Sequence, residues 1–294
     1  MAKIRRPVVA GAFYPGTAEG LRKEIEGCFS HRLGAGLTGL EGKPAAGKSI
    51  AGKGKSKEKL IGAVVPHAGY VYSGPCATHV YSRLRESSGE IKTAVILGPN
   101  HTGLGSGVSV SDADKWSTPL GEVEVDVELR KKILEASDII DCEPMAHAQE
   151  HSIEVQLPFL QTVLKDFRFV PICLMLNDEK TCREVGEAIA KAAGSRKGVV
   201  VLASSDMTHY EPAQSAQRKD RMAIDAVEEL DPSKLLQAVF RENITMCGVA
   251  PAAAMLFAMK KLGAKEGRLL KYYNSGDITG DSSSVVGYAS IGIF

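Results

Sequence analysis

Short apolar runs and longer amphipathic stretches alternate along this chain of 294 residues. Runs of this length without a polar face are typical of central strands in a parallel sheet. Apolar positions that recur every three to four residues predict helices that cover such a sheet. The predicted strands are residues 61–66, 94–99, 167–174, 199–205 and 285–293. The predicted helices are residues 17–30 with Thr17 as N-cap, 73–84, 127–136, a segment after Ser152, 179–193, 213–230, 233–240 and 250–262. The alternation predicts an α/β fold, a mainly parallel sheet flanked by helices on both faces.

Residues that can bind metal or move protons follow four of the apolar segments. They are His67, His101, Asp206 with His209, and Cys247, which follows residues 243–246 at the head of a predicted helix. In a parallel sheet, functional groups collect beyond the carboxyl ends of the strands. We therefore expect these residues to converge on one pocket.

Composition and charge narrow the class of protein. A chain that is 44% hydrophobic and 24% charged can bury a large core, and its length suits one α/β domain, residues 1–294. Its formal charge of +1 gives no electrostatic reason to expect nucleic acid or an anionic membrane as partner, which favours a small molecule or peptide. The N-terminus has no apolar signal region, and no apolar run approaches the ~20 residues of a membrane span, so we expect a cytoplasmic protein.

A segment rich in glycine and lysine, residues 34–59, shows no hydrophobic period and is predicted to be a flexible insertion. Within it, residues 42–49 match the Walker A pattern letter by letter. A phosphate loop needs a strand before it and a helix after it. Neither flank can form one, so the sequence favours a surface insertion over a nucleotide site.

Each candidate residue has a structural alternative to its functional interpretation. His67, followed by small residues, is predicted to be a ligand or a base, with a satisfied core histidine as the alternative, and Gly98–His101 repeats that design one strand later. Asp206 and His209 suit a hydrogen-bonded pair or a metal ligand with an orienting neighbour, unless Asp206 only caps the turn. The six cysteines show no Cys-x-x-Cys spacing. Most are expected to be buried hydrophobes, but a helix N-terminus would lower the pKa of Cys247, whose alternative is an inert buried thiol.

Residues 147–151 spell His-x-x-Glu-His, the pattern of inverted zinc proteases. Both histidines of that pattern must share one face of a helix. Pro158 is tolerated only near a helix start, so the helix is predicted to begin at Ser152, after the motif. A zinc protease is therefore disfavoured, and Glu150 and His151 are expected at the rim of the pocket.

Seven motifs in order along the chain resemble the Memo family, named for a mediator of ErbB-driven cell motility, whose microbial members are called AmmeMemoRadiSam system protein B. The resemblance covers nearly the whole chain, with residues 34–59 outside it. The motifs are Arg6–Pro15, Pro66–Gly74, Gly98–His101, Glu150–Glu154 with Leu157–Pro158, Ser204–His209, Cys247–Gly248, and Ser275–Asp281 with Val286–Tyr288.

The resemblance implies a fold similar to class III extradiol dioxygenases, non-haem iron enzymes that hold iron with two histidines and a carboxylate. The residues that match the metal site of Memo proteins are His67, His101 and Cys247, with Asp206 and His209 beside them. Cys247 thus stands where a ring-cleaving enzyme carries glutamate. A thiolate is softer than a carboxylate, so copper or zinc is expected to bind as well as Fe(II), and catechol cleavage is put in doubt.

The leading hypothesis is a cytosolic redox metalloprotein of unknown substrate. Its metal, Fe(II) first and copper or zinc as alternatives, would bind His67, His101 and Cys247, while His209 moves protons and Asp206 orients it or a bound water. The residues expected to shape the substrate pocket are Tyr70, Asn100, Trp116, Glu150 and His151. The microbial gene context of the resembling family also implies a radical-SAM protein as partner.

Two other hypotheses stay open. The first is a non-catalytic module that binds a peptide or anionic ligand in the same cleft. The second is a hydrolase or transferase in which Cys247 is the nucleophile, His209 the base and Asp206 the orienting residue.

Overall fold

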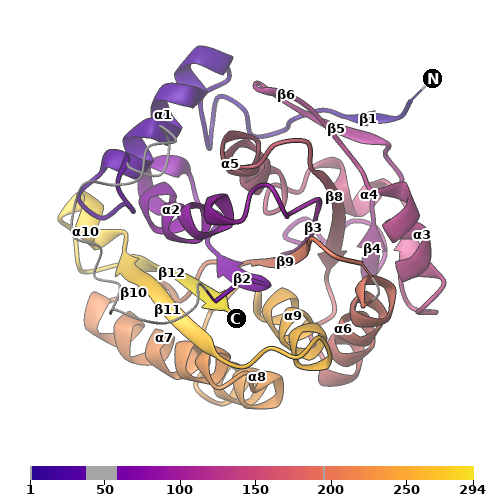
Figure 1. The fold of residues 1–294 in the computed structure, drawn as a ribbon. Helices are drawn as coiled ribbons and strands as arrows, with labels where there is room; N and C mark the ends of the chain where they lie inside the picture. Colours follow the sequence, from indigo (N-terminus) through magenta and orange to yellow (C-terminus); the bar gives the residue numbers. More distant parts are fainter. Residues whose placement is uncertain (1, 38–57, 195) are drawn as a thin grey trace.

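A large sheet forms the centre of the molecule (Figure 1). The computed structural model describes residues 2–37, 58–194 and 196–294. Within these, the sheet has nine strands in the order β10-β12-β2-β9-β3-β8-β4-β7, and β11 also pairs with β12. Its strands are β2 (Gly62–Val65), β3 (Thr93–Pro99), β4 (Val108–Val110), β7 (Asp141–Cys142), β8 (Arg168–Leu174), β9 (Val199–Ser204), β10 (His209–Glu211), β11 (Gly267–Asn274) and β12 (Val285–Ile293).

The sheet is parallel in its middle and mostly antiparallel toward its edges. The four central strands β2, β9, β3 and β8 run parallel. β12 is antiparallel to β2, β10 and β11, and β4 is antiparallel to β8. The predicted α/β class is confirmed, and its parallel part is the centre, where fully buried strands give the strongest apolar signal.

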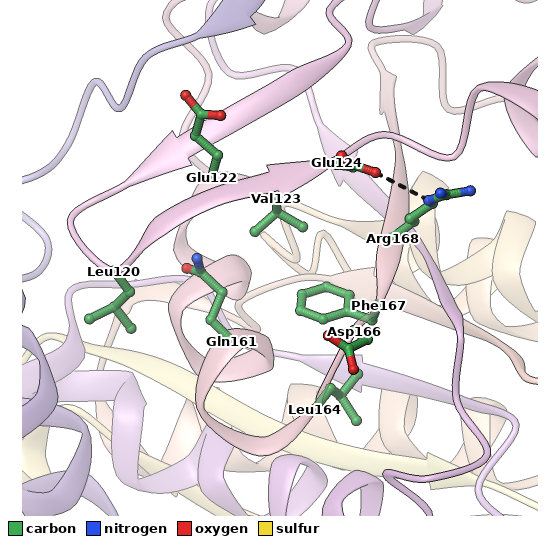
Figure 2. A pocket seen from close by; sticks show the side chains of 9 residues that line it. All are labelled: Leu120, Glu122, Val123, Glu124, Gln161, Leu164, Asp166, Phe167 and Arg168. Carbon is green, nitrogen blue, oxygen red and sulfur yellow. Dashed lines mark ion pairs between the residues drawn. The ribbon is translucent and has the colours of Figure 1, made fainter.

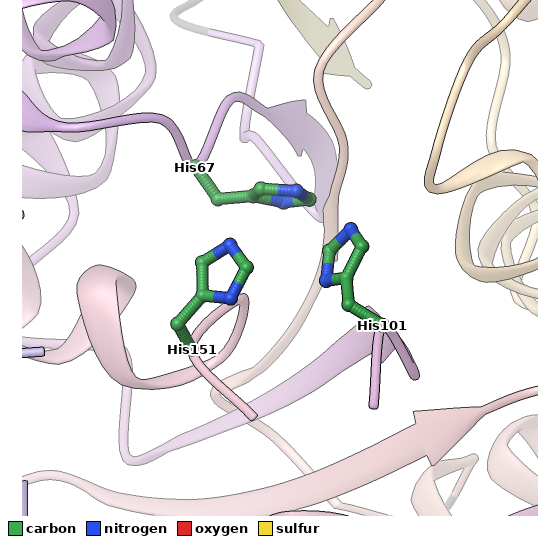
Figure 3. A group of neighbouring side chains, drawn as sticks. All are labelled: His67, His101 and His151. Carbon is green, nitrogen blue, oxygen red and sulfur yellow. The ribbon is translucent and has the colours of Figure 1, made fainter. Parts of the chain in front are cut away.

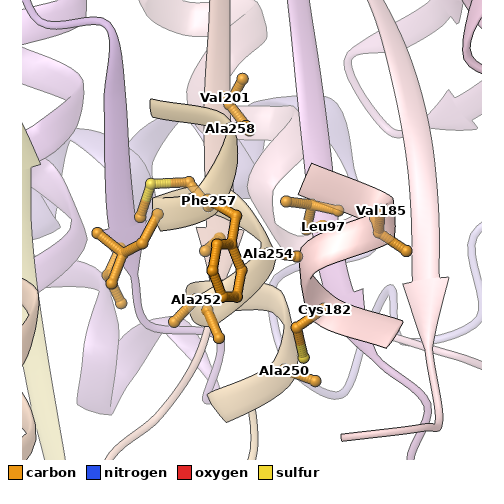
Figure 4. Packing of buried hydrophobic residues seen from close by; sticks show 14 of the residues in the cluster. Leu97, Cys182, Val185, Val201, Ala250, Ala252, Ala254, Phe257 and Ala258 are labelled. Atoms are coloured by element: carbon orange, nitrogen blue, oxygen red, sulfur yellow. The ribbon is translucent and has the colours of Figure 1, made fainter. Parts of the chain in front are cut away.

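Helices cover both faces of this sheet (Figure 1). Successive strand residues point to opposite faces. In β3, Ala94 and Ile96 belong to the hydrophobic cluster that contains α1, α2 and α5 residues. Val95 and Leu97 belong to the cluster of the opposite face, where Leu97 and Val201 lie near α6 and α9 (Figure 4). The first face carries α1 (Ala18–Ser30), α2 (Tyr70–Glu86) and α5 (Leu157–Val163), and the second α3 (Val127–Leu134), α6 (Glu179–Ala193), α7 (Ala213–Glu228), α8 (Pro232–Arg241) and α9 (Val249–Lys261).

Most predicted helices are confirmed, with shifts at their ends. α6 has the predicted bounds, and the Thr17 side chain caps α1 by accepting a hydrogen bond from Gly20 N. α2 begins three residues before the predicted start, at Tyr70. The prediction that a helix begins at Ser152 is wrong, because a 3₁₀ turn, Glu154–Gln156, comes first and α5 follows. Residues 243–246, another apolar segment, form no strand.

Smaller elements pack around this core. A second sheet joins β1 (Ile4–Arg5), β5 (Lys115–Thr118) and β6 (Gly121–Glu124). Beside β6 and α5 lies a surface pocket of about 470 Å³, drawn with its lining side chains in Figure 2. Two short helices, α4 (Met145–Ala148) and α10 (Gly276–Thr279), lie in connecting segments.

Two predictions from the sequence concern residues outside the described ranges and the absence of a membrane span. The Walker A match at residues 42–49 lies outside the described residues. Of the helices in the described ranges, none combines the length and the apolar character that crossing a bilayer requires.

Candidate metal centre

The residues predicted to converge do share one cleft, of about 470 Å³. His67 follows β2 and His101 follows β3, so both stand at the carboxyl edge of the central strands. Asp206 follows β9, and Cys247 precedes α9. The lining residues are Phe13, His67, Ala68, Gly69, His101, His151, Asp206, His209, Tyr210, Thr245, Cys247 and Val286.

Three imidazoles point toward one another in this cleft (Figure 3). His67, His101 and His151 each offer a ligand atom, and these atoms all lie within 4.8 Å of one another. The rings of His101 and His151 stack at a centroid distance of 4.7 Å, and His67 stands edge-on to both. His151, expected only at the rim, thus belongs to the group best placed to hold an ion.

The buried carboxylate of Glu150 holds two of these histidines from behind. It accepts hydrogen bonds from the backbone N–H groups of His101, His151 and Ser152, at 2.6, 2.9 and 2.8 Å. Its Oε1 also lies 3.0 Å from His101 Nδ1. Burial alone would raise the pKa of Glu150, but these hydrogen bonds and the neighbouring His101 lower it to about 2. Glu150 therefore orients the metal-capable histidines and does not line the cleft, where it was predicted to shape the substrate pocket.

His67 is enclosed, with only 2% of its surface exposed. Its backbone N–H donates to Asp206 Oδ1 at 2.8 Å, and its Nδ1 lies 2.9 Å from Ser204 Oγ. Burial, and then the neighbouring imidazoles of His151 and His101, lower the pKa of His67 well below its usual value. The ring is therefore neutral, which is the form that binds metal.

Cys247 lies beside His67 but outside the group of three imidazoles. Its Sγ is 3.2 Å from His67 Nε2 and accepts a hydrogen bond from Asp206 N at 3.3 Å. Burial and then the Asp206 carboxylate raise the pKa of the thiol. This direction is opposite to the expected lowering by the α9 N-terminus, because burial disfavours the charged thiolate. Binding through this sulfur would require the proton to leave.

The predicted hydrogen-bonded pair of Asp206 and His209 is not found among the described residues. Asp206 Oδ1 instead accepts from the backbone N–H groups of His67 and Ala68. His209 is fixed by Thr245, whose carbonyl lies 2.9 Å from Nδ1 and whose hydroxyl accepts from the His209 backbone. Burial raises the pKa of Asp206 to about 6. Both side chains line the cleft, but each is held by its own partners.

Three residues predicted to shape the substrate pocket lie elsewhere. Tyr70 is buried and donates to the carbonyl of Val155. Trp116 is also buried, packed against the Arg5 guanidinium. The side chain of Asn100 accepts from Thr102 and Gly103 and so closes its own loop. These positions are set by packing and loop closure, which short motifs do not reveal.

The His-x-x-Glu-His segment does not form a protease site. α4 ends at Ala148, before Glu150 and His151. His147 is buried beside Ser109, with its Nε2 3.2 Å from the hydroxyl. It lies outside the imidazole group, so the two histidines of the motif do not share one ligand set.

Two further residues that line the cleft, Phe13 and Tyr210, were not predicted from the sequence. Phe13 packs its ring 4.7 Å from that of His151, and Tyr210 is 79% exposed with a left-handed φ of 58°. Tyr210 sits at the irregular register between β10 and β12. Phe13 belongs to one of the seven motifs, whereas the bulge at Tyr210 has no local sequence signal.

Fold and cleft together define an α/β protein with a histidine-rich site at the carboxyl edge of its sheet. A solved structure with the same architecture is that of an uncharacterized protein from Escherichia coli K12, with a TM-score of 0.56 and 14% identity over 80% of this chain and 100% of that one. At that identity the likeness concerns the fold alone.

The chain belongs to the Memo-like protein family, which matches residues 5–292. It is 50% identical to a MEMO1 family protein of Methanopyrus kandleri over 98% of both chains, and 49% identical to one of Methanocaldococcus jannaschii over 99% of both. A MEMO1 family protein of Methanothermobacter thermautotrophicus is 45% identical over 98% of this chain and 99% of its own.

Proposed function

We propose that the cleft binds one transition-metal ion and that the protein is a metal-dependent redox protein acting on a small molecule. The observation that carries this proposal is the group of three imidazoles with ligand atoms within 4.8 Å of one another. His67 and His101 are proposed as ligands in either case, and the third ligand is His151 or Cys247. Their donor atoms face a cleft rather than a closed core, which is typical of a site that admits a substrate.

The residues present fit a metal. Imidazole nitrogen suits iron, copper and zinc, and the nearby sulfur of Cys247 adds preference for soft ions. His151 would complete an all-imidazole set without the loss of a thiol proton, and this harder set is the one we assign to Fe(II). Cys247, already 3.2 Å from His67 Nε2, is the third ligand expected for Cu(I). A bound iron or copper ion would supply one-electron redox chemistry.

The chain's own groups would position the substrate and move its protons. His209 holds its ring through Nδ1 against the Thr245 carbonyl, so Nε2 is the atom that would accept a proton. Asp206, with a pKa of about 6, can exchange a proton near neutral pH. The volume of about 470 Å³ suits a small molecule, and Phe13 and Tyr210 offer it apolar contact.

Anaerobic metal titration tests the proposal. Metal-free protein is titrated with Fe(II) and, separately, with Cu(I), and we expect one ion per chain. His67→Ala and His101→Ala should each weaken binding by at least about tenfold, since each removes a ligand. His79→Ala, a histidine of α2 outside the group, is the matched control.

Equal affinity in the wild type, His67→Ala and His101→Ala would refute the metal site. If the metal binds as expected but neither loaded form reacts with oxygen or accepts electrons, the metal site stands and the redox role does not.

A further inference from the structure

We infer that Ser204 and Gln156 are positioning residues that keep the imidazole proton of His67 on Nδ1, so that the Nε2 lone pair faces the cleft. This inference rests on the proposed metal site and specifies how one ligand is prepared for it. Both residues are buried, Ser204 at the end of β9 and Gln156 in the 3₁₀ turn before α5.

Counting donors and acceptors fixes the hydroxyl proton of Ser204. Its Oγ lies 2.7 Å from the carbonyl oxygen of Ser152, which can only accept, so the hydroxyl donates there. The same Oγ lies 2.8 Å from Gln156 Nε2 and 2.9 Å from His67 Nδ1. Because the hydroxyl donates its proton to Ser152, its oxygen can only accept hydrogen bonds from Gln156 and His67. The ring of His67 therefore carries its proton on Nδ1.

The orientation of the Gln156 amide is fixed in the same way. Its Nε2 lies 3.0 Å from the carbonyl of Pro66, an acceptor only, so this atom must be the NH₂ group. The amide oxygen then accepts from the Tyr81 hydroxyl on α2. The NH₂ group directed at Ser204 keeps the hydroxyl proton from turning toward the amide, and turning it toward His67 would leave the Ser152 carbonyl facing a bare oxygen at 2.7 Å. The side chains of Ser204, Gln156 and Tyr81 thus form one buried network whose hydrogen bonds are satisfied.

The opposite side of the imidazole agrees with this assignment. Cys247 Sγ lies 3.2 Å from His67 Nε2, close enough for its S–H group to donate a hydrogen bond to that nitrogen. A thiol can donate only to a bare nitrogen. His101 is prepared alike, because its Nδ1 faces the Glu150 carboxylate at 3.0 Å. His67 and His101 thus both present Nε2 to the cleft, although different residues, Ser204 and Glu150, hold their Nδ1 atoms.

Nuclear magnetic resonance of ¹⁵N-histidine-labelled, metal-free protein tests the inference without any metal or activity. Long-range ¹H–¹⁵N correlations tell a protonated ring nitrogen from a bare one, and His67→Gln identifies the signals of His67. We expect the proton on Nδ1 in the wild type. In Ser204→Ala, which removes the acceptor, we expect it to move to Nε2, and Zn(II) affinity to fall by about tenfold or more.

Tyr81→Phe is the matched control, because it removes one hydroxyl from the same network but leaves Ser204 and the amide in place. It should keep the wild-type proton position and an affinity for Zn(II) within about twofold of the wild type. Gln156→Leu should give a mixture of the two ring forms, because the orientation of the Ser204 hydroxyl then depends on the Ser152 carbonyl alone.

A proton on Nε2 in the wild type overturns the inference, as does a Ser204→Ala spectrum that matches the wild type. If Ser204→Ala does not fold, the wild-type spectrum and Gln156→Leu decide by the same criteria. A wild type that has the Nδ1 proton but binds no metal would refute the proposed function and leave this assignment intact.

Discussion

Glu150 concentrates four acceptor contacts in one buried carboxylate, divided between its two oxygens. Oε1 faces His151 N, Ser152 N and His101 Nδ1, and Oε2 faces His101 N. In Glu150→Gln, whichever way the amide turns, its NH₂ group opposes at least one N–H donor. We expect the free energy of unfolding to fall by about 2–4 kcal/mol and Zn(II) affinity by at least about tenfold.

Urea unfolding and calorimetric titration measure the two effects of Glu150→Gln. The control is Glu122→Gln. Glu122 forms a surface ion pair with Lys115, so this substitution should change the free energy of unfolding by less than about 1 kcal/mol. Wild-type metal affinity in Glu150→Gln would show that Glu150 supports the fold alone.

His147 should make stability depend on pH. Burial lowers its pKa to about 4, while the unfolded chain has the usual value of 6.5. As the pH falls from 7 to 4, the unfolded state takes up this proton first, so stability declines and then levels off below about pH 4. The difference of roughly 2.5 pKa units corresponds to about 3 kcal/mol.

Urea unfolding between pH 7 and 4 checks this dependence. His147→Gln keeps a donor for Ser109 but has no proton to gain, so its stability should fall by about 3 kcal/mol less than that of the wild type over this range. Parallel pH profiles of the two proteins would contradict the assignment.

At the residue scale, sequence reasoning found the residues that follow strands and missed those that support them. His67, His101 and Cys247 stand beyond strand or helix ends, where position alone signals function. Ser204 forms hydrogen bonds with Gln156, 48 positions away in the sequence, and with His67, 137 positions away. No local pattern encodes such partners, so they were accessible only from the structure.

At the scale of elements, one buried carboxylate, that of Glu154, holds the N-terminal segment beside the cleft through an ion pair and hydrogen bonds. Glu154 accepts from the Arg5 guanidinium, the Val8 and Val9 amides and the Tyr14 hydroxyl. This places Phe13 against His151. Glu154→Gln should lower the free energy of unfolding by about 3 kcal/mol, because the Arg5 side chain, which is 8% exposed, loses its partner charge.

Hydrogen exchange localises the effect of Glu154→Gln. The amides of Val8 and Val9 should exchange at least about tenfold faster, while those of α6 and α9 should change only as far as global stability does. Glu86→Gln removes an exposed ion pair with Arg83 and should leave the Val8 and Val9 amides at wild-type rates. Unchanged protection of Val8 and Val9 in Glu154→Gln would contradict this role.

Elements with a strong periodic signal were predicted well, and those set by distant partners were not. The parallel centre of the sheet and α6 follow from apolar period and length. β10 is three residues long and exists because β12 pairs with it, and the sheet of β1, β5 and β6 joins segments 111 residues apart. Pairing of that kind leaves no trace in either segment alone.

At the scale of the whole molecule, the carboxyl edge of the sheet is where loops from different parts of the chain meet. The convergence of His67, His101 and Asp206 on one cleft was predictable, because each follows a parallel strand. Which side chains would lie within ligand distance was not, because His151 and Cys247 reach the cleft on loops. The proposed metal site therefore has two candidates for a third ligand beside His67 and His101, the imidazole of His151 and the softer sulfur of Cys247.

Thermal unfolding should separate these two ligand sets. An ion at about 100 times its Kd stabilises the folded chain by roughly 2.7 kcal/mol, which raises the Tm by about 4 °C for a chain of this size. With Cu(I), Cys247→Ser should lose most of this shift and His151→Ala should keep it, since the soft ion prefers sulfur. With Fe(II) the order should reverse, and His67→Ala should abolish both shifts. If one of the two variants removed the shift for both metals, a single ligand set would serve them, and the softness argument would fail while the metal site itself would stand.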